Sequence, residues 1–453
     1  MVTNNTALAK PAGARAWLES IQGKRQYDIN QVLYRCTQSG SLLNVAHDMD
    51  ALRQTSAAEW RRLFDARMGR WDFPNASGIW SKREWVLPDI DPAHIITLQE
   101  GRSPLLEMPP LARELGLEQV WLKECGTSHT GSFKDLGMTV LVSHVNSLIA
   151  RGLPIRAVAC ASTGDTSAAL AAYASRAGIP TIVFLPAGKI TTAQLIQPIS
   201  NGAHVLSLDT DFDGCMRIVQ EVTADQSIYL ANSMNPLRIE GQKTVGIEII
   251  QQLGWQLPDW MIIPGGNLGN VSALAAGLDM LLETGIINQK PRLAVAQAAH
   301  ANPLYTSYQK GFADLEPMQA KTTLASAIQI GNPVSFPRAV DALQRYNGVV
   351  EEVSEAELAH AAALADRQGF FCCPHTGVAL GALRKLTGKG VIPGGASVAV
   401  ISTAHGLKFS EFKTAYHENR LDFDATYRTE VIRLPADVQA VQEALKPLLE
   451  ERA

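Results

Sequence analysis

Residues 131–135 read Gly131-Ser132-Phe133-Lys134-Asp135 and place one lysine between a glycine turn and a periodic apolar run. Leu141, Val145 and Leu148 follow at helical spacing, which predicts that Lys134 lies in the first turn of a helix packed into a core. An ammonium group held there and partly desolvated has a lowered pKa, so it can form a Schiff base with an aldehyde cofactor such as pyridoxal phosphate. The simpler interpretation of the residue alone is a solvated surface lysine.

The segment 126–131 carries two glycines at the spacing of a nucleotide phosphate loop. Position 132 is a serine where that motif requires lysine, and Lys134 comes two residues too late to reach the phosphates in the same way. A GTPase or a kinase is therefore not expected.

The length of 453 residues exceeds what one hydrophobic core usually supports, so at least two domains are expected. The formal net charge is −4 and there is no basic tract, which argues against nucleic acid or an anionic membrane as partner and favours small molecules. No apolar run is long enough to span a bilayer, and residues 1–18 lack the order of a secretory signal. We expect a cytoplasmic location, with a short transit peptide to the plastid stroma as the alternative.

The cysteines are expected to be reduced, mostly buried thiols of a cytosolic-type protein. They form no C-x-x-C pair and have no accompanying histidine spacing, so no metal site is predicted. The six cysteines are Cys36, Cys125, Cys160, Cys215, Cys372 and Cys373.

Short apolar runs alternate with amphipathic helical segments from about residue 155 onward, which predicts an α/β fold of parallel sheets wrapped in helices. Near-continuous apolar runs are typical of strands covered on both faces, and ligands bind beyond the carboxyl ends of such strands. The predicted strands are residues 155–160, 181–185, 204–208, 228–231, 260–263, 293–296 and 398–402. The first 95 residues contain five tryptophans and no regular strand alternation, so they are expected to form an added helical and loop region.

Polar clusters follow several of these strands. Residues 264–270, Pro264-Gly265-Gly266-Asn267-Leu268-Gly269-Asn270, join a predicted strand to a helix, so their backbone amides and the helix dipole form a cradle for a phosphate. A tight turn that needs glycine is the alternative. Residues 162–167 join another strand to an alanine-rich helix and offer amides and hydroxyls for a carboxylate, or simply an N-cap for that helix.

A third cluster spans residues 232–244 and offers amide, hydroxyl, guanidinium and ammonium donors suited to a second phosphate. Arg238 and Lys243 are its cations, and the alternative is that they lie on the solvated face of a helix. His375 and His405 lie beside other predicted turns and stay unassigned, because a lone histidine in such a place is more often structural than catalytic.

The motifs together resemble, over nearly the whole chain, the threonine synthases of the plant type, which are pyridoxal-phosphate enzymes of fold type II, the tryptophan synthase β-like group. The resemblance implies two doubly wound parallel-sheet domains with an N-terminal helical extension. The extension would be residues 1–95, the large cofactor-binding domain residues 96–136 and 236–453, and the small α/β domain residues 137–235. The motifs that carry the resemblance are residues 129–138, 161–167, 264–270, 327–331 and 403–409.

The resemblance also implies roles for individual residues. Lys134 would be the Schiff-base lysine, Thr403 the partner of the pyridine nitrogen, and Asp165 would face the cofactor's 3-hydroxyl, where many relatives have asparagine. The other implied cofactor contacts are Gly265, Gly266, Asn267, Leu268, Gly269 and Asn270. The implied substrate contacts are Ser162, Thr163, Gly164 and Thr166 for an α-carboxylate, and Asn232, Ser233 and Arg238 for a leaving phosphate. The implied reaction converts O-phospho-L-homoserine and water into L-threonine and phosphate by γ-elimination and β-addition.

Two other functions compete with this one. A threonine or serine dehydratase uses the same cofactor but needs no second phosphate site, so Arg238 and Lys243 would distinguish it. A catalytically silent metabolite sensor would be expected to lack the lysine or the phosphate loop, and both are present.

The N-terminal segments 34–36, 40–43 and 78–85 resemble the extension of plant-type threonine synthases, some of which S-adenosylmethionine activates at a dimer interface. A homodimer and an S-adenosylmethionine effector site are therefore expected. Tryptophan faces could receive the sulfonium cation, although tryptophans that only pack the extension onto the core are commoner.

Overall fold

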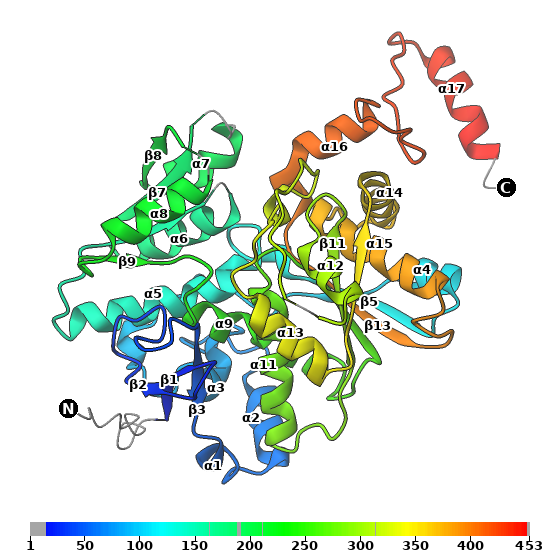
Figure 1. Ribbon diagram of the computed structural model, residues 1–453. Helices are drawn as coiled ribbons and strands as arrows, with labels where there is room; N and C mark the ends of the chain where they lie inside the picture. Colours follow the sequence, from blue (N-terminus) through cyan, green and yellow to red (C-terminus); the bar gives the residue numbers. More distant parts are fainter. Residues whose placement is uncertain (1–14, 163, 188–191, 211, 313, 451–453) are drawn as a thin grey trace, which may run out of the picture.

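The computed structural model of the protein contains one large parallel sheet, one smaller parallel sheet and a small antiparallel sheet near the N-terminus (Figure 1). The prediction of an α/β protein with two parallel-sheet units is confirmed. The domain boundaries at residues 95, 136 and 235 stay predictions. The residues described by the structure are 15–162, 164–187, 192–210, 212–312 and 314–450.

The large sheet has six strands in the order β12-β11-β10-β13-β5-β4, all parallel except β4. Its strands alternate strictly between two cores, because successive side chains of a strand point to opposite faces. Met261 and Ile263 join one core, and Trp260 and Ile262 join the other. The strands are β4 (Leu105–Glu107), β5 (Gln119–Glu124), β10 (Trp260–Pro264), β11 (Arg292–Ala298), β12 (Val349–Val353) and β13 (Ser397–Ser402).

Helices cover both faces of the large sheet, as expected for parallel strands that are apolar on both sides. One face packs against α10 (Thr244–Gln252), α11 (Gly269–Glu283) and α13 (Phe336–Arg345). The other packs against α4 (Pro109–Leu115), α14 (Glu355–Asp366), α15 (Pro374–Gly388) and α16 (Ser410–His417). Helix α12 (Pro303–Gln309) follows β11, and α17 (Val438–Glu450) stands apart from the body at the end of the chain (Figure 1).

The smaller sheet has four parallel strands in the order β8-β7-β6-β9, which are β6 (Ala157–Ala161), β7 (Thr181–Pro186), β8 (His204–Leu208) and β9 (Ile228–Leu230). Its helices are α5 (Lys134–Ala150), α6 (Asp165–Arg176), α7 (Thr192–Ser200) and α8 (Phe212–Val222). Strand β8 lies where it was expected, but the prediction that both its faces are covered is wrong. It is an edge strand, and its side chains are exposed or half-buried.

The N-terminal region contains helices α1 (Met49–Leu52), α2 (Ala57–Arg67) and α3 (Arg83–Val86), and also a three-stranded antiparallel sheet. That sheet consists of β1 (Ala16–Ser20), β2 (Gln26–Tyr27) and β3 (Leu43–His47) and was not expected from the sequence. Its central strand β1 is buried at four of five positions, so it lacks the polar and apolar alternation by which a half-buried strand is recognised.

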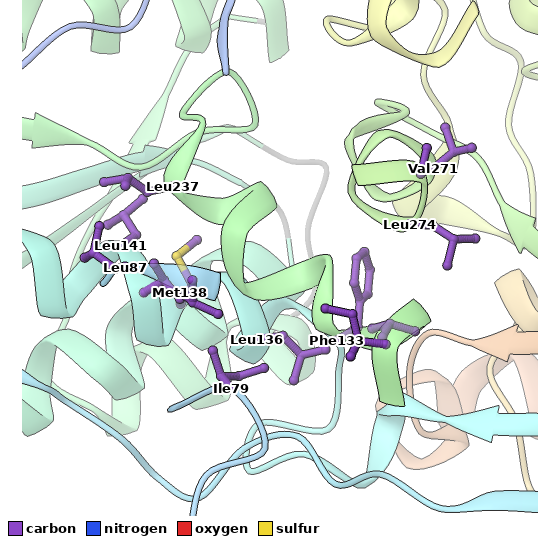
Figure 2. Close-up of a cluster of buried hydrophobic side chains, with 14 of the residues drawn as sticks. Ile79, Leu87, Phe133, Leu136, Met138, Leu141, Leu237, Val271 and Leu274 are labelled. Carbon is purple, nitrogen blue, oxygen red and sulfur yellow. The ribbon is translucent and has the colours of Figure 1, made fainter. Parts of the chain in front are cut away.

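The extension is packed tightly onto the rest of the protein. Trp60 and Trp85 meet edge to face with ring centroids 5.5 Å apart, and the indole N–H of Trp80 donates to the hydroxyl of Thr139 on α5 at 2.8 Å. Figure 2 shows Ile79 and Leu87 of the extension in one apolar cluster with residues of α5, of α9 (Leu237–Gln242) and of α11. The extension therefore shares its core with the helices that carry the functional site. Among the described residues, no helix combines the length and the apolar character needed to cross a lipid bilayer.

Candidate active site

A pocket lies where α5, α6 and α9 meet the turns that follow β10 and β13. It gathers residues from segments far apart in the sequence, including most of those predicted to hold a cofactor. The residues that line it are Phe133, Lys134, Asp165, Ser233, Arg238, Ile239, Gln242, Pro264, Gly266, Asn267, Leu268, Gly269, Asn270, Ala327, Ile328, His375 and Thr403.

Lys134 is the first residue of α5 and its side chain reaches into this pocket. The amine lies 4.2 Å from the ring centroid of Phe133. Burial, and next the positive charge of Arg238, lower the pKa of Lys134 from 10.5 to about 7, while the carboxylate of Asp165 opposes that shift. The surface-lysine interpretation is therefore wrong, and near neutral pH a large fraction of this amine is uncharged and nucleophilic.

The turn from β10 to α11 forms the predicted cradle. The backbone N–H groups of Gly266, Asn267 and Leu268 have no hydrogen-bond partner among the described residues, and Leu268 adopts a left-handed conformation with φ of 66°. A Cβ atom at position 266 would lie 2.9 Å from Cα of Ile328, so the turn needs glycine there. These free donors at the start of a 15-residue helix suit an anion.

Two residues brace the cradle. The N–H of Gly265 donates to the carbonyl of Ala296 at 2.8 Å, so Gly265 anchors the turn to the neighbouring strand and does not line the pocket. The side-chain amide of Asn270 donates to the carbonyl of Pro264 at 2.6 Å and closes the turn on itself. The shape of the cradle is therefore fixed before any ligand enters.

Arg238 on α9 supplies a second, separate positive group. Its guanidinium is buried and donates to the carbonyl of Ala231 at 3.2 Å and the hydroxyl of Thr166 at 3.4 Å, while Nε has no partner among the described residues. Burial lowers its pKa to about 10. A buried cation without a carboxylate partner is costly, so a bound anion would stabilise it. Gln242 lines the pocket one helical turn further on.

Several predicted substrate residues do not line this pocket. Asn232 uses its whole amide on Ala161, accepting from the N–H at 3.0 Å and donating to the carbonyl at 2.9 Å. The hydroxyl of Ser162 accepts from the N–H groups of Gly164 at 3.3 Å and Ser167 at 3.2 Å, so it caps the start of α6. Thr166 is engaged by Arg238 as described above. Thr163 lies outside the described residues.

Lys243 also lies away from the pocket, and both interpretations of it are wrong. It is buried, so it does not lie on a solvated face, and it does not line the pocket as a phosphate ligand would. Its amine pairs with Glu240 and lies 2.9 Å from Nε2 of His47 on β3 of the extension. Nε2 of His47 in turn lies 2.6 Å from the carboxylate of Glu240. The three side chains form a buried triad of a carboxylate, an ammonium and an imidazole, and burial and next the charge of Lys243 lower the pKa of His47, which favours its neutral form.

Thr403 follows β13 and lines the pocket with His375. The thiol of Cys373 lies 3.8 Å from the Thr403 hydroxyl and 3.4 Å from Nδ1 of His375. Burial would raise the pKa of this thiol, but the charge and the hydrogen bond of His375, together with two hydrogen bonds from Thr376, lower it to about 7. His375 also accepts from the N–H of Ala327 at 3.0 Å, which ties two pocket segments together.

His375 and Gln242 both line the pocket, although His375 was unassigned from the sequence and Gln242 was not among the predicted site residues. The one signal for His375 was its position in a Cys-Pro-His-Thr-Gly turn before a helix. Gln242 carried a weaker signal, its spacing of four residues from Arg238, which places both on one face of a helix.

Comparison with known proteins defines the class. The model of a family described as "Pyridoxal-phosphate dependent enzyme" matches residues 96–404 of the chain. The chain therefore belongs to this family. "Threonine synthase 2, chloroplastic" of Arabidopsis thaliana is 54% identical over 426 residues, which cover 93% of this chain and 82% of that protein. The threonine synthase of Methanocaldococcus jannaschii is 36% identical over 427 residues, covering 94% of this chain and 98% of that protein. Within the family, the chain is thus a member of the threonine synthases.

The fold agrees with this membership. The crystal structure of threonine synthase from Escherichia coli superimposes with a TM-score of 0.64 at 20% identity and covers 95% of this chain and 100% of that one. Maize serine racemase superimposes with a TM-score of 0.59 at 18% identity, covering 76% of this chain and 98% of that one. At such identities the likeness concerns the fold alone, which is therefore shared by enzymes of different activity.

The pocket fits pyridoxal phosphate. The cradle offers free N–H groups to a phosphate and only glycine fits at position 266. Lys134 offers an amine whose lowered pKa suits reaction with an aldehyde. Thr403 offers a neutral hydroxyl, which can face a pyridine nitrogen without protonating it.

Proposed function

We propose that this protein, a pyridoxal-phosphate-dependent lyase, converts O-phospho-L-homoserine and water into L-threonine and inorganic phosphate, the last step of threonine biosynthesis. The observation that carries the proposal is the presence of two anion sites in one pocket, the amide cradle at residues 266–270 and the buried guanidinium of Arg238. One suits the cofactor's phosphate, and the other suits the phosphate of the substrate.

The cofactor supplies an electron sink that makes protons on the neighbouring substrate carbons removable. Lys134 would anchor the cofactor, and its Nζ atom would move protons between substrate carbons. A pKa of about 7 suits this role, because the amine can both accept and donate a proton near neutral pH. We assign the cofactor phosphate to Gly266, Asn267, Leu268, Gly269 and Asn270, with Gly265 bracing the turn.

Thr403 would contact the pyridine nitrogen and Asp165 the 3-hydroxyl group. A threonine hydroxyl leaves that nitrogen largely unprotonated, which weakens the electron sink and helps to restrict side reactions. The cofactor would thus meet a neutral partner on one side of its ring and a carboxylate on the other.

The substrate would be held at two ends. The turn at residues 162–166, at the start of α6, would hold the α-carboxylate. Ser233, Arg238 and Gln242 would hold the leaving phosphate. Asn232 would not touch the substrate, but its hydrogen bonds to Ala161 would fix the ends of the neighbouring strands. The charge of Arg238 stabilises the phosphate as it departs, because the leaving group gains negative charge in the transition state.

The competing activity in the same cofactor class is a threonine or serine dehydratase. A dehydratase substrate carries no phosphate and would leave the guanidinium of Arg238 buried without an anion. Steady-state assays of the purified protein decide between the two. We expect phosphate release from O-phospho-L-homoserine with a much higher kcat/KM than deamination of serine or threonine, and the opposite ranking would favour the dehydratase.

A homodimer, a cytoplasmic location and control by S-adenosylmethionine complete the proposal. The location is supported by the six cysteines, which are all buried and form no disulfide, as in reducing compartments. Trp60, Trp80 and Trp85 are buried in the core, whereas Trp71 is 78% exposed, so its ring is accessible to an effector. Light scattering tests the dimer. Steady-state kinetics and calorimetry with saturating S-adenosylmethionine test the effector, and unchanged kinetics with no binding heat would leave the extension a structural role.

A further inference from the structure

Lys408 makes a three-way contact at the edge of the active site. It lies in a short 3-10 helix, η5 (Gly406–Phe409), just after the last strand of the large sheet. Its amine lies 3.2 Å from Oδ1 of Asp165, and it donates to Oε1 of Gln197 at 2.5 Å and to the carbonyl of Thr130 at 2.9 Å. The side chain is only 16% exposed, so these contacts are largely shielded from water.

The three partners come from separate segments. Thr130 lies in the loop that leads to Lys134, and Asp165 and Gln197 belong to α6 and α7 of the smaller sheet. The amide of Gln197 also donates to the carbonyl of Thr130 at 3.1 Å, so the contact is a closed set of hydrogen bonds. Lys408 therefore ties the large sheet to the smaller one beside Asp165, which lines the pocket.

The contact also explains how a carboxylate can sit at position 165. The side chain of Asp165 is 7% exposed, and a charge so deeply buried needs a partner. Lys408 is the one cation within ion-pair distance of it among the described residues. Asp165 lines the pocket with Lys134 and its negative charge acts on that amine. Removing Lys408 would leave an uncompensated carboxylate beside the reactive lysine.

We propose that Lys408 is a positioning residue for the reaction. Its ion pair with Asp165 orients that carboxylate toward the cofactor site, and its hydrogen bonds to Thr130 and Gln197 connect the two sheets. The proposal rests on the proposed function only in taking the pocket as the cofactor site. Asp165 and Lys408 then act as a matched pair. Asparagine at position 165 would need no cation, so the pair predicts that Lys408 matters much less once Asp165 is neutral.

A double-mutant cycle on the full-length protein tests this pairing. The variants are Lys408→Met, Lys408→Arg, Asp165→Asn and the double change, and the readout is the dissociation constant of pyridoxal phosphate measured by fluorescence titration of the apoprotein. We expect Lys408→Met to weaken cofactor binding about tenfold or more in the native background and less than about threefold in the Asp165→Asn background. We expect Lys408→Arg to restore binding to within about threefold of the native value, because it keeps the charge.

Lys413→Met is the matched control. Lys413 on α16 forms a comparably buried pair with Asp366, but Asp366, unlike Asp165, does not line the pocket. Its loss should lower the melting temperature and leave the cofactor dissociation constant unchanged. The proposal fails if the effects of Lys408→Met and Asp165→Asn simply add, if arginine rescues no better than methionine, or if Lys413→Met weakens the cofactor equally. Cofactor affinity is measured without substrate, so a failure of the proposed reaction would appear separately, as absent phosphate release by the native protein.

Discussion

Replacing Arg238 by methionine separates binding of the substrate phosphate from stability of the fold. The change keeps most of the side-chain volume and removes only the buried guanidinium. A charge-assisted hydrogen bond to phosphate is worth about 1.5 to 3 kcal/mol. Since about 1.4 kcal/mol is a factor of ten, kcat/KM for O-phospho-L-homoserine should fall roughly 10- to 150-fold. Both parameters should change, because the phosphate gains charge as it leaves.

Stability should respond very little to the same change. Arg238 makes two long hydrogen bonds, its Nε has no partner among the described residues, and no carboxylate depends on it. Its loss therefore leaves no buried charge behind. The cofactor's cradle lies on a different turn, so cofactor occupancy measured from the visible absorption band should also stay near the native value.

Lys243→Met is the contrasting control. It removes a buried cation five residues further along the chain, and it leaves Glu240 without its main partner. Breaking a buried pair in this way typically costs about 3 to 5 kcal/mol, so the melting temperature should drop clearly. Phosphate release and thermal melts of both variants complete the test. If Arg238→Met keeps kcat/KM within twofold of the native value, Arg238 does not hold the substrate phosphate and the assignment is refuted.

Three further outcomes follow from the pocket. Lys134→Ala should abolish phosphate release and the visible band of the bound cofactor while leaving the melting curve cooperative, and more than trace turnover would contradict the role of Lys134. The rate of cofactor uptake by the apoprotein should rise with pH and reach half its maximum near pH 7, because the neutral amine is the reactive form and the pKa of Lys134 is lowered to about 7. A half-point near 10 in stopped-flow absorbance would show an unperturbed lysine. Gly266→Ala should weaken pyridoxal phosphate binding, since the added Cβ would lie 2.9 Å from Cα of Ile328, whereas Gly388→Ala meets no atom within 4 Å and should leave binding unchanged. Equal affinities of the two variants in equilibrium dialysis would argue against the cradle.

Among the parallel strands, the sequence alone predicted those that are near-continuous apolar runs and missed two that carry charges. All seven predicted strands are present within a few residues of the expected bounds. Strand β5 was missed because it carries Lys123 and Glu124, and β12 because it carries Glu351 and Glu352. Lys123 is fully buried and donates to Glu248 at 2.9 Å, a partner 125 residues away. No local pattern reveals such a pairing.

The candidate site was predictable in its loops but not in the direction of its side chains. The turn after β10 and the lysine at the start of α5 follow from local rules for glycine turns and helix starts. The cluster at residues 232–244 contains two cations, Arg238 and Lys243, that were equally good candidates for binding a phosphate, and only Arg238 lines the pocket. Lys243 is turned away by His47, which lies 196 residues earlier in the chain. Helical spacing turns position 243 away from the face that Arg238 shares with Gln242, but only the tertiary contact with His47 shows where the amine goes.

The buried triad of His47, Glu240 and Lys243 connects the N-terminal extension to α9, the helix that carries Arg238. The family match begins at residue 96, but α9, which carries Arg238, is held from behind by a histidine at position 47. A version of the chain that began at residue 96 would leave the carboxylate of Glu240 and the ammonium of Lys243 without His47, next to the helix that carries Arg238. We therefore expect the smallest functional unit of this protein to be larger than the span that the family model matches, and we expect insertions or deletions within the first three strands to change substrate affinity.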